Sequence, residues 1–390
     1  MDASPRIAKK AQFDSQRLAS IGIRLERDVA SGVIPGAAIM IGSSERTIFE
    51  QHVGFRELMT SDPLRSDAIW RIYSMTKPIV TTAAMVFVEN GLLRLDQAVA
   101  EFIPSFAKLH VAQSGGPDVL ASQPPTIQDL MRHTAGLSYG YLGDSTAQRA
   151  YVADGFLNED LSNEAFVERL AALPLEHHPG ATWHYSHATD VLGRVLEIIS
   201  GRSLGDVLHQ TLFQPLGMLE TCFELPPDKH ARVAEPLPQP GCSRPHFFDP
   251  CLRRRHQSAG GGLLSTVDDY ARFLRMLLGN GTYNRNRILS AATVSYMTAD
   301  HLGNVRRGNY YPPGPGYGFG LGVAVRLSTG VAPFPGSRGD YFWSGVGGTY
   351  FWVDPARQFF ALFMLQSSLA EQRLHYRTLM RNMIYAAIDD

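Results

Sequence analysis

The chain has 390 residues, of which 44% are hydrophobic and 19% are charged. A chain of this length can build two or three domains with large apolar cores and needs no disulfide or metal support. With 36 Lys and Arg against 37 Asp and Glu, the formal net charge is −1, which argues against a general nucleic-acid binder because phosphate binding requires a broad basic field.

The N-terminal part predicts a helix followed by a hairpin. In residues 14–31 apolar side chains recur every three or four positions, as on one face of an amphipathic helix, and Pro35-Gly36 ends the segment. Residues 37–42 and 47–53 are short and rich in β-prone residues, and the polar stretch 43–46 separates them. This pattern is typical of a hairpin in an antiparallel sheet.

The middle of the chain is predicted to be mainly helical. Residues 74–93 are apolar with helical spacing and end at Asn90-Gly91. Further helical patterns lie at residues 126–133, 163–173, 187–200 and 204–214. Seven prolines then crowd residues 224–250, which indicates an extended, ordered loop or a domain border.

Strands return in the C-terminal part. A triple glycine at 260–262 is followed by a helix expected over residues 265–278, with an N-capping hydroxyl and two acids at its start. Strands are then predicted at residues 320–327, 348–353 and 359–365, with a last helix at 370–388.

This order of elements predicts an α+β fold. A discontinuous α/β domain would combine residues 1–73 and 258–390, and a mainly helical domain, residues 74–257, would be inserted into it. We expect an antiparallel sheet flanked by the N- and C-terminal helices, with the active site at the interface between the two domains.

The lack of a visible targeting signal and the small number of cysteines predict a cytoplasmic protein. No apolar run approaches the roughly 18 to 20 residues of a membrane span, and the polar N-terminal segment lacks the apolar core of a secretory signal. Cys222, Cys242 and Cys251 are an odd number without metal-ligand spacing, so we expect neither a disulfide framework nor a zinc site.

A nucleophile-elbow pattern, Gly-x-Ser-x-Gly, occurs once, at residues 201–205. An elbow needs a buried strand before its serine, whereas residues 191–200 read as an amphipathic helix. Gly201 fits the C-terminal cap of that helix and Ser203 the N-cap of the next one. We therefore interpret Ser203 as structural.

The sequence Ser74-Met75-Thr76-Lys77 offers a better nucleophile. A helix places positions i and i+3 on one face, so the lysine amine can reach the serine hydroxyl and act as its base if desolvation lowers its pKa. Pro78 supports a helix start here, because proline lacks an N–H and is tolerated in a first helical turn. The alternative is an N-capping serine beside a solvated lysine.

Two more motifs accompany this one. Tyr185-Ser186-His187 follows about 110 residues later, and Trp343-Ser344-Gly345 lies on a predicted strand. Together the three motifs resemble those of the serine β-lactamase and DD-peptidase superfamily, and within it the class C β-lactamase-like carboxylesterases, often called family VIII esterases. Supporting stretches at residues 133–137, 214–218 and 260–266 extend the resemblance over about residues 15 to 385.

The resemblance implies roles for individual residues. Ser74 would be the acylated nucleophile, and Lys77 and Tyr185 would share the general-base work, the phenol by losing its proton beside an ammonium. The backbone N–H groups of Ser74 and Val346 would form the oxyanion hole. No metal or other cofactor is needed for this chemistry.

Two departures from the superfamily pattern bear on the substrate. The second motif usually ends in Asn, which holds a substrate amide, but here it ends in His187. The third motif usually begins with Lys, which pairs with a substrate carboxylate, but here it begins with Trp343 and continues to Gly345. We expect these three residues to contact the substrate and a neutral aromatic wall to favour uncharged esters.

The sequence therefore predicts a serine carboxylesterase that hydrolyses short- to medium-chain esters through an acyl-enzyme. An acyltransferase, a β-lactamase or a D-amino-acid peptidase would use the same nucleophile, and weak β-lactam hydrolysis would be compatible with it. A non-catalytic binding protein is the remaining alternative. The Pro-rich segment and the aromatic stretch 310–317 would either line the cleft or cover the sheet.

Overall fold

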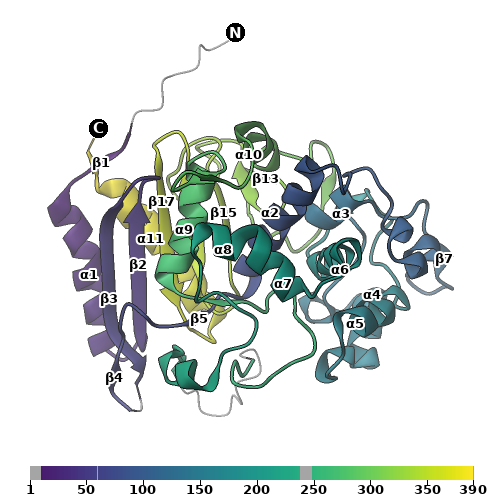
Figure 1. Cartoon of the computed structure of the whole chain (residues 1–390), viewed down its shortest axis with the longest axis horizontal. Helices are drawn as coiled ribbons and strands as arrows, with labels where there is room; N and C mark the ends of the chain where they lie inside the picture. The colour runs from purple at the N-terminus through teal and green to yellow at the C-terminus, as the bar shows by residue number, and fades with distance from the viewer. Residues whose placement is uncertain (1–9, 59, 238–247, 390) are drawn as a thin grey trace, which may run out of the picture.

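The computed structural model describes residues 10–58, 60–237 and 248–389. Its centre is an eight-stranded sheet in which every neighbouring pair is antiparallel (Figure 1). In spatial order the strands are β13 (Tyr317–Phe319), β14 (Ala324–Arg326), β15 (Tyr341–Ser344), β16 (Tyr350–Asp354), β17 (Phe359–Leu365), β2 (Gly36–Gly42), β3 (Thr47–Glu57) and β4 (Asp62–Pro63). Because β17 pairs with β2, both ends of the chain share one sheet.

Helices cover both faces of this sheet, and its central strands are therefore buried throughout. Helix α1 (Ser15–Ala30) begins at Asp14, whose side chain accepts the amides of the first turn. It packs against β3 and against α11 (Ala370–Ala386), while α9 (Val267–Leu278) packs against β2 and β17. The predicted flanking of an antiparallel sheet by the terminal helices is confirmed.

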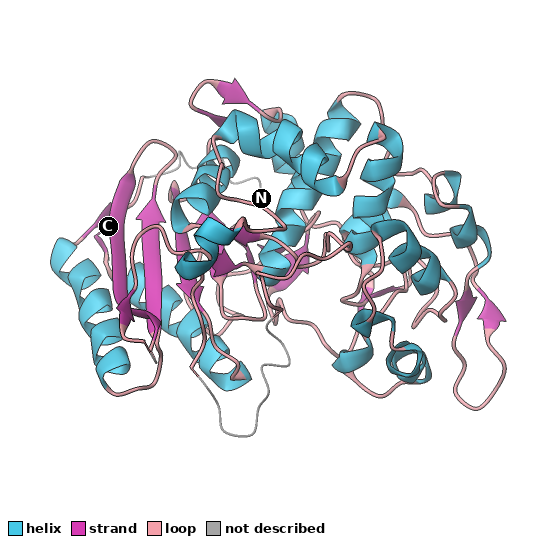
Figure 2. Ribbon diagram, turned by 60° about the horizontal axis from the view of Figure 1, so that its bottom comes forward, coloured by secondary structure: helices cyan, strands magenta, loops and turns pink. Residues whose placement is uncertain are grey.

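Most of the remaining helices gather on one side of the sheet, as Figures 1 and 2 show. They are α2 (Thr76–Glu89), α3 (Ile127–Met131), α4 (Thr146–Asp154), α5 (Asn163–Ala171), α6 (Ala188–Ser200), α7 (Leu204–Leu208) and α8 (Gln214–Leu216). A π-helical turn, His209–Phe213, joins α7 to α8, so the helix predicted at 204–214 is continuous but irregular. The division into two domains at residues 74 and 257 stays a prediction.

Short elements complete the fold. The chain ends meet where β1 (Gln12–Phe13) pairs with β18 (Ile388–Asp389). Other two-stranded pairs are β5 (Trp70–Arg71) with β9 (Leu264–Ser265), β6 (His110–Val111) with β7 (Val119–Leu120), β8 (Thr182–Trp183) with β12 (Arg306–Arg307), and β10 (Thr282–Tyr283) with β11 (Asn286–Arg287). Helix α10 (Ala291–Met297) and 3-10 turns at Val99–Glu101, Pro104–Lys108, Gly140–Leu142, Phe156–Asn158 and Pro227–Arg232 lie between them.

One predicted strand is wrong in its extent. Of residues 320–327 only Ala324–Arg326 form a strand, because residues 320–323 make the turn between β13 and β14. The Gly320 amide donates to the Val323 carbonyl at 2.8 Å, and Gly322 has a φ of +79°. Glycine tolerates this left-handed conformation, so the turn interrupts what reads as one β-prone run.

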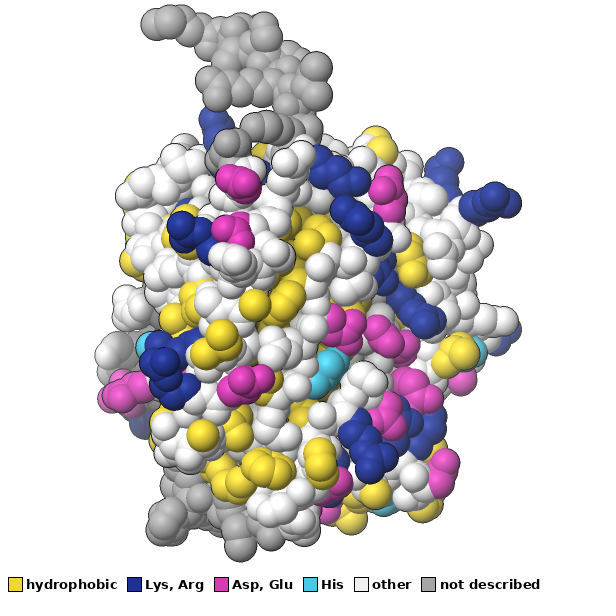
Figure 3. All heavy atoms as spheres, turned by 90° about the vertical axis from the view of Figure 1, so that its left-hand side faces the viewer, with side chains coloured by type: hydrophobic (Ala, Val, Ile, Leu, Met, Phe, Trp, Pro, Cys, Tyr) yellow, Lys and Arg dark blue, Asp and Glu magenta, His cyan; other side chains and the backbone are white. Residues whose placement is uncertain are grey.

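The surface charges are mixed (Figure 3), and the described cysteines are free thiols. On the face that carries α1, basic and acidic side chains are interspersed (Figure 3), and ion pairs join Arg24 to Asp28 at 3.0 Å and Arg56 to Asp62 at 2.7 Å. Within the described residues, every helix is too short or too polar to cross a bilayer. Cys222 and Cys251 are free thiols; Cys242 and residues 238–247 of the Pro-rich segment lie outside the described residues.

A buried charge cluster ties the last helix to the sheet. Asp340 accepts from Arg326 Nε at 2.7 Å and from Arg381 Nη1 at 3.0 Å, and all three side chains are fully buried. Each guanidinium therefore depends on one carboxylate for its charge balance, because a buried charge without a partner is costly.

We expect Asp340→Ala to lower the free energy of unfolding by about 3–5 kcal/mol, because it leaves two buried guanidinium groups without their carboxylate. Denaturant unfolding followed by circular dichroism measures this change. Asp96→Ala is the matched control: Asp96 pairs with Arg94 at 3.0 Å with 79% of its side chain exposed, and its loss should cost less than about 1 kcal/mol. Equal effects of the two substitutions would contradict the interpretation.

Candidate active site

Ser74 lies in a 3-10 turn, η1 (Tyr73–Met75), immediately before α2. The chain reaches this turn from β5, and Tyr73 adopts a φ of +46°, which is unfavourable for a residue with a side chain. The predicted placement of Ser74 at a helix start is confirmed, and α2 ends with Asn90 as its C-cap.

The segment after the triple glycine runs beside this turn. Trp70 of β5 pairs with Ser265 of β9, and the Ile72 amide donates to the Leu263 carbonyl at 3.1 Å. The Leu263 amide in turn donates to Thr76 Oγ1 at 3.2 Å. These bonds bring two segments that are almost 200 residues apart in the chain to the nucleophile.

Lys77 is fully buried beneath Ser74. Its Nζ lies 3.4 Å from Ser74 Oγ, 3.0 Å from the Tyr139 hydroxyl and 2.6 Å from the Gly260 carbonyl oxygen. Burial lowers the pKa of Lys77 to about 7, although the negative charge of Asp190 opposes the change. At neutral pH a large fraction of the amine is therefore unprotonated and able to accept a proton from the serine.

Tyr185 also lies beside the lysine amine, whose nitrogen is 4.7 Å from the centre of the Tyr185 ring. Its buried hydroxyl makes no hydrogen bond of good geometry to any described residue. Burial raises the pKa of Tyr185, and the neighbouring Ser74 and Trp343 side chains offset this only in part. Desolvation thus disfavours the phenolate, and the expected share of Tyr185 in the general-base work stays a prediction.

The third motif forms a tight turn after β15. The Gly345 amide donates to the Thr349 carbonyl at 2.8 Å, and the Gly348 amide donates to the Gly345 carbonyl at 3.1 Å. This turn presents Val346, which is 44% exposed, to the same pocket as Ser74. The oxyanion hole at the backbone amides of Ser74 and Val346 stays a prediction that this arrangement supports.

Gly345 allows this turn to approach the nucleophile. A Cβ atom at position 345 would lie 2.6 Å from the Ile72 carbonyl oxygen, too close for any side chain. Thr349 Oγ1 donates to the same oxygen at 3.2 Å. The third motif therefore contacts the backbone just before Ser74 and determines the position of Val346 relative to it.

Trp343 is buried on β15 and packs against protein side chains. Its ring centre is 5.4 Å from that of Tyr185 and 5.2 Å from that of Phe319, both in edge-to-face geometry. The pocket lining does not include Trp343 or Gly345, so their contact with a substrate stays a prediction. In this structure Trp343 packs against Tyr185.

His187 is buried at the N-terminus of α6 and does line the pocket. Its Nδ1 lies 3.0 Å from Asp190 Oδ2, and its ring packs 4.2 Å from that of Tyr139. Burial lowers the pKa of His187 despite the nearby carboxylate. When the neutral ring carries its proton on Nδ1 and donates it to Asp190, Nε2 is left as a hydrogen-bond acceptor.

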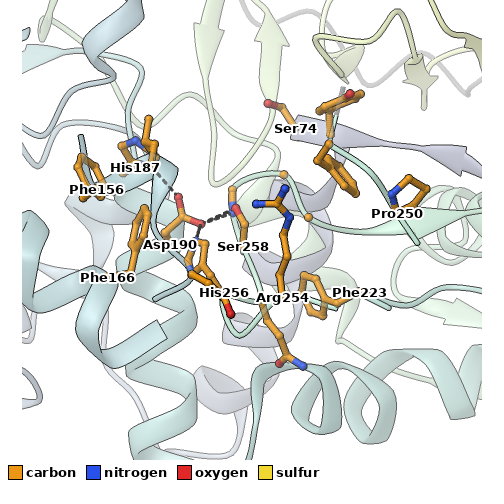
Figure 4. A pocket seen from close by; sticks show the side chains of 18 of the residues that line it. Ser74, Phe156, Phe166, His187, Asp190, Phe223, Pro250, Arg254, His256 and Ser258 are labelled. Carbon is orange, nitrogen blue, oxygen red and sulfur yellow. Dashed lines mark hydrogen bonds and ion pairs between the residues drawn. The ribbon is translucent and has the colours of Figure 1, made fainter. Parts of the chain in front are cut away.

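The pocket has a volume of about 280 Å³ and opens beside Ser74 and Val346. Figure 4 shows side chains from several elements converging on it. Its aromatic lining consists of Tyr73, Tyr139, Tyr141, Phe156, Phe166, Phe223 and Phe248. Phe248 and Pro250 come from the Pro-rich segment, which therefore lines the cleft, whereas Tyr310 lines a neighbouring pocket.

Sequence reasoning missed Tyr139, Asp190 and His256, all of which line this pocket. Asp190 follows His187 by three positions at the start of a helix, a spacing that could have indicated their contact. Tyr139 and His256 carried no such signal, because their contacts join segments far apart in the chain. Within the described ranges, no three His, Cys, Asp or Glu side chains are arranged to hold a metal ion.

The interpretation of Ser203 is confirmed. Gly201 caps α6 in a left-handed conformation, with a φ of 65°. Ser203 is the N-cap of α7, where its side chain accepts the Asp206 amide. A helix rather than a strand precedes this serine, so the geometry of a nucleophile elbow is missing.

Comparison with known proteins agrees with this site. The model of the beta-lactamase family matches residues 24–381. The chain belongs to the beta-lactamase family. Its match to that family covers all three motifs, and the predicted resemblance and fold class are confirmed.

Relatives within the family span nearly the whole chain. Protein Rv1367c of Mycobacterium tuberculosis is 32% identical over 355 residues, covering 86% of each protein. Esterase EstB of Burkholderia gladioli is 28% identical over 374 residues, covering 90% of this chain and 91% of the relative. The solved structure of EstCE1, "a hydrolase with promiscuous acyltransferase activity", is similar with a TM-score of 0.78 and 25% identity, covering 95% of this chain and 99% of that one.

This beta-lactamase family member is accordingly a serine hydrolase of the kind represented by the family VIII carboxylesterases. The family assignment establishes the fold and the general class of enzyme. The substrate and the roles of individual side chains depend on the geometry described above.

Gly345→Ala should lower the maximal rate of ester hydrolysis by about 10-fold to 100-fold, because the added methyl must push Val346 away from Ser74, and displacements near 1 Å can have effects of this size. Steady-state kinetics with a chromogenic ester measures the loss. Gly330→Ala serves as the control, since a Cβ there meets no atom within 4 Å. Wild-type kinetics for Gly345→Ala would show that the close approach is unimportant.

Proposed function

We propose that the protein is a carboxylesterase that hydrolyses short- to medium-chain, uncharged esters through an acyl-enzyme on Ser74. The observation that carries the proposal is the position of Lys77, a fully buried amine 3.4 Å from Ser74 Oγ with a pKa lowered to about 7. The similarity to Esterase EstB and to EstCE1 supports the same reaction class.

Acylation follows from these contacts. Lys77 accepts the hydroxyl proton as Ser74 Oγ attacks the ester carbonyl carbon, and the carbonyl oxygen becomes an oxyanion beside the amides of Ser74 and Val346. Tyr185, which burial keeps protonated, donates its proton to the leaving alcohol oxygen and recovers one from the Lys77 ammonium.

Deacylation repeats the proton transfers with water. Lys77, neutral again, accepts a proton from a water molecule that attacks the acyl carbonyl, and Ser74 leaves with the proton that Lys77 returns. In this proposal the Lys77 amine is the base, and the Tyr185 phenol acts as an acid and proton carrier. This division of roles follows from the opposite directions in which burial moves the pKa values of an amine and a phenol.

The pocket supports the proposed substrate class. The seven Tyr and Phe side chains in its lining offer apolar contacts to an acyl or alcohol group, and its volume of about 280 Å³ suits a small or medium-sized one. At the third motif, Trp343 stands where a carboxylate-binding lysine would be expected, so that position offers no cation to a charged substrate.

An acyltransferase is the second candidate, because the EstCE1 structure is described as that of a hydrolase with promiscuous acyltransferase activity. The chemistry is the same up to the acyl-enzyme, after which an alcohol replaces water. A β-lactamase or peptidase is less well supported, since His187 stands where those enzymes usually carry Asn and its Nδ1 is engaged by Asp190, which leaves Nε2 as an acceptor but no free donor for a substrate amide.

The rate constant kcat/KM should rise with pH through about 7, since Lys77 is the base in its unprotonated form and its pKa lies at about 7. Initial rates with a chromogenic butyrate ester, measured from pH 5 to 9 and corrected for spontaneous hydrolysis, give this profile. Rates that begin to rise only near pH 9 would indicate a lysine with its ordinary pKa and would contradict the assignment of the base.

A fluorophosphonate should label one serine, Ser74, because an activated hydroxyl reacts with this class of probe. Peptide mass mapping locates the adduct, which should be absent from Ser74→Ala and unchanged in Ser203→Ala. An adduct on Ser203 would refute the assignment of the nucleophile. Complete absence of labelling, with an ester bound but not hydrolysed, would instead support a binding protein.

A further inference from the structure

We propose that Asp190 is a positioning residue whose buried carboxylate holds the Gly260 carbonyl against the Lys77 amine and supplies the negative charge that acts on that amine. The proposal rests on the proposed function, in which Lys77 is the base. It assigns a role in that reaction to a side chain that touches neither Ser74 nor, by this geometry, the reacting ester.

Asp190 lies in the first turn of α6 and is 3% exposed. Its carboxylate accepts from His187 Nδ1 at 3.0 Å, from Ser258 Oγ at 2.8 Å and from the Gly260 amide at 2.8 Å, and His256 Nε2 lies 3.7 Å away. Figure 4 shows the carboxylate at the centre of this group. Three hydrogen-bond donors and a nearby imidazole, from two segments of the chain, thus converge on one side chain.

Gly260 links this carboxylate to the catalytic amine. Its N–H donates to Asp190 Oδ1 at 2.8 Å, while its carbonyl oxygen accepts from Lys77 Nζ at 2.6 Å. A Cβ at position 260 would lie 2.7 Å from Asp190 Oδ2, so the contact requires a glycine. The backbone of one residue is therefore held from both sides, and a shift of the carboxylate would move the oxygen that orients the amine.

The charge on Asp190 is maintained by its donors. Burial alone would raise the pKa of this carboxyl, but the hydrogen bond from His187 and the nearby His256 imidazole outweigh burial and hold the pKa well below its ordinary value. The carboxylate is therefore ionised at every pH at which the enzyme would be assayed, and its charge favours the protonated form of Lys77.

The other groups that face Lys77 contribute no opposing anion. They are the hydroxyl of Ser74, the phenols of Tyr139 and Tyr185, and the imidazoles of His133 and His187. Burial raises the pKa of both phenols and lowers the pKa of both imidazoles, so all four are neutral near pH 7. Asp190 is consequently the ionised group in the described surroundings that favours the charged amine.

The decisive variant is Asp190→Asn, which keeps the shape and an oxygen acceptor for Gly260 but removes the charge. Without that charge the Lys77 amine loses its proton at lower pH, so the rise of kcat/KM should move to lower pH by at least ~0.5 unit. We also expect kcat to fall about 10-fold, with a smaller change in KM, because a neutral acceptor holds the Gly260 amide less firmly than a carboxylate and the amine is then less well oriented.

Two further variants separate charge from structure. Asp269→Asn is the matched control. Asp269 lies in α9, is 4% exposed and accepts from the Glu220 amide and the Thr221 hydroxyl. This variant should leave the pH at which kcat/KM rises unchanged. Asp190→Glu retains the charge but displaces the oxygen, and should lower kcat with the rise near its wild-type pH. If Asp190→Asn does not fold, Asp190→Ser also removes the charge, and the pH dependence of kcat/KM is measured on that variant.

The outcomes are distinguishable from failure of the proposed function. A wild-type enzyme that labels on Ser74 and shows a rise near pH 7, together with an unmoved rise in Asp190→Asn, would overturn the positioning role and leave the esterase proposal intact. A loss of thermal stability in that variant without any change in the pH profile would mean that Asp190 is only structural. A wild-type enzyme without labelling at Ser74 would reject the proposed function itself.

Discussion

Burial of the Lys77 amine is the constraint on which the rest of the site depends. A fully buried ammonium is costly unless a carboxylate contacts it, and among the described residues Lys77 contacts only neutral oxygen atoms, those of Ser74, Tyr139 and Gly260. The low pKa of Lys77 is the consequence, and it turns a residue that is normally a cation into a base. The surrounding fold must exclude water from the amine and still leave Ser74 open to the pocket.

Two close backbone approaches satisfy that requirement. Gly260 lies between Asp190 and the amine, and Gly345 lies against the backbone that precedes Ser74. Each contact is too short for a side chain, so each glycine is required by packing and not by conformational freedom. The segments that meet there adjoin β9, α2, α6 and β15, so the site joins residues that lie far apart in the chain.

The same water-excluded surroundings move the pKa values of Lys77 and Tyr185 in opposite directions. Desolvation disfavours any charged form, so it lowers the pKa of Lys77 and raises that of Tyr185. The proposed mechanism therefore uses the amine as the proton acceptor and the phenol as the donor. Trp343, buried behind Tyr185, contributes to this environment, which explains how a third motif without a lysine can still support the reaction proposed here.

The sequence by itself determined the elements and the chemical groups. Periodicity predicted α1, the β2–β3 hairpin and α2, because local side-chain patterns depend on which face of an element is buried; spacing separated Ser74 from the structural Ser203. Only the tertiary structure revealed Tyr139, Asp190 and the turn at residues 320–323, and only it showed that burial moves the pKa values of Lys77 and Tyr185 in opposite directions. Contacts between distant segments and the degree of desolvation decide these points, and neither can be read from spacing along one chain.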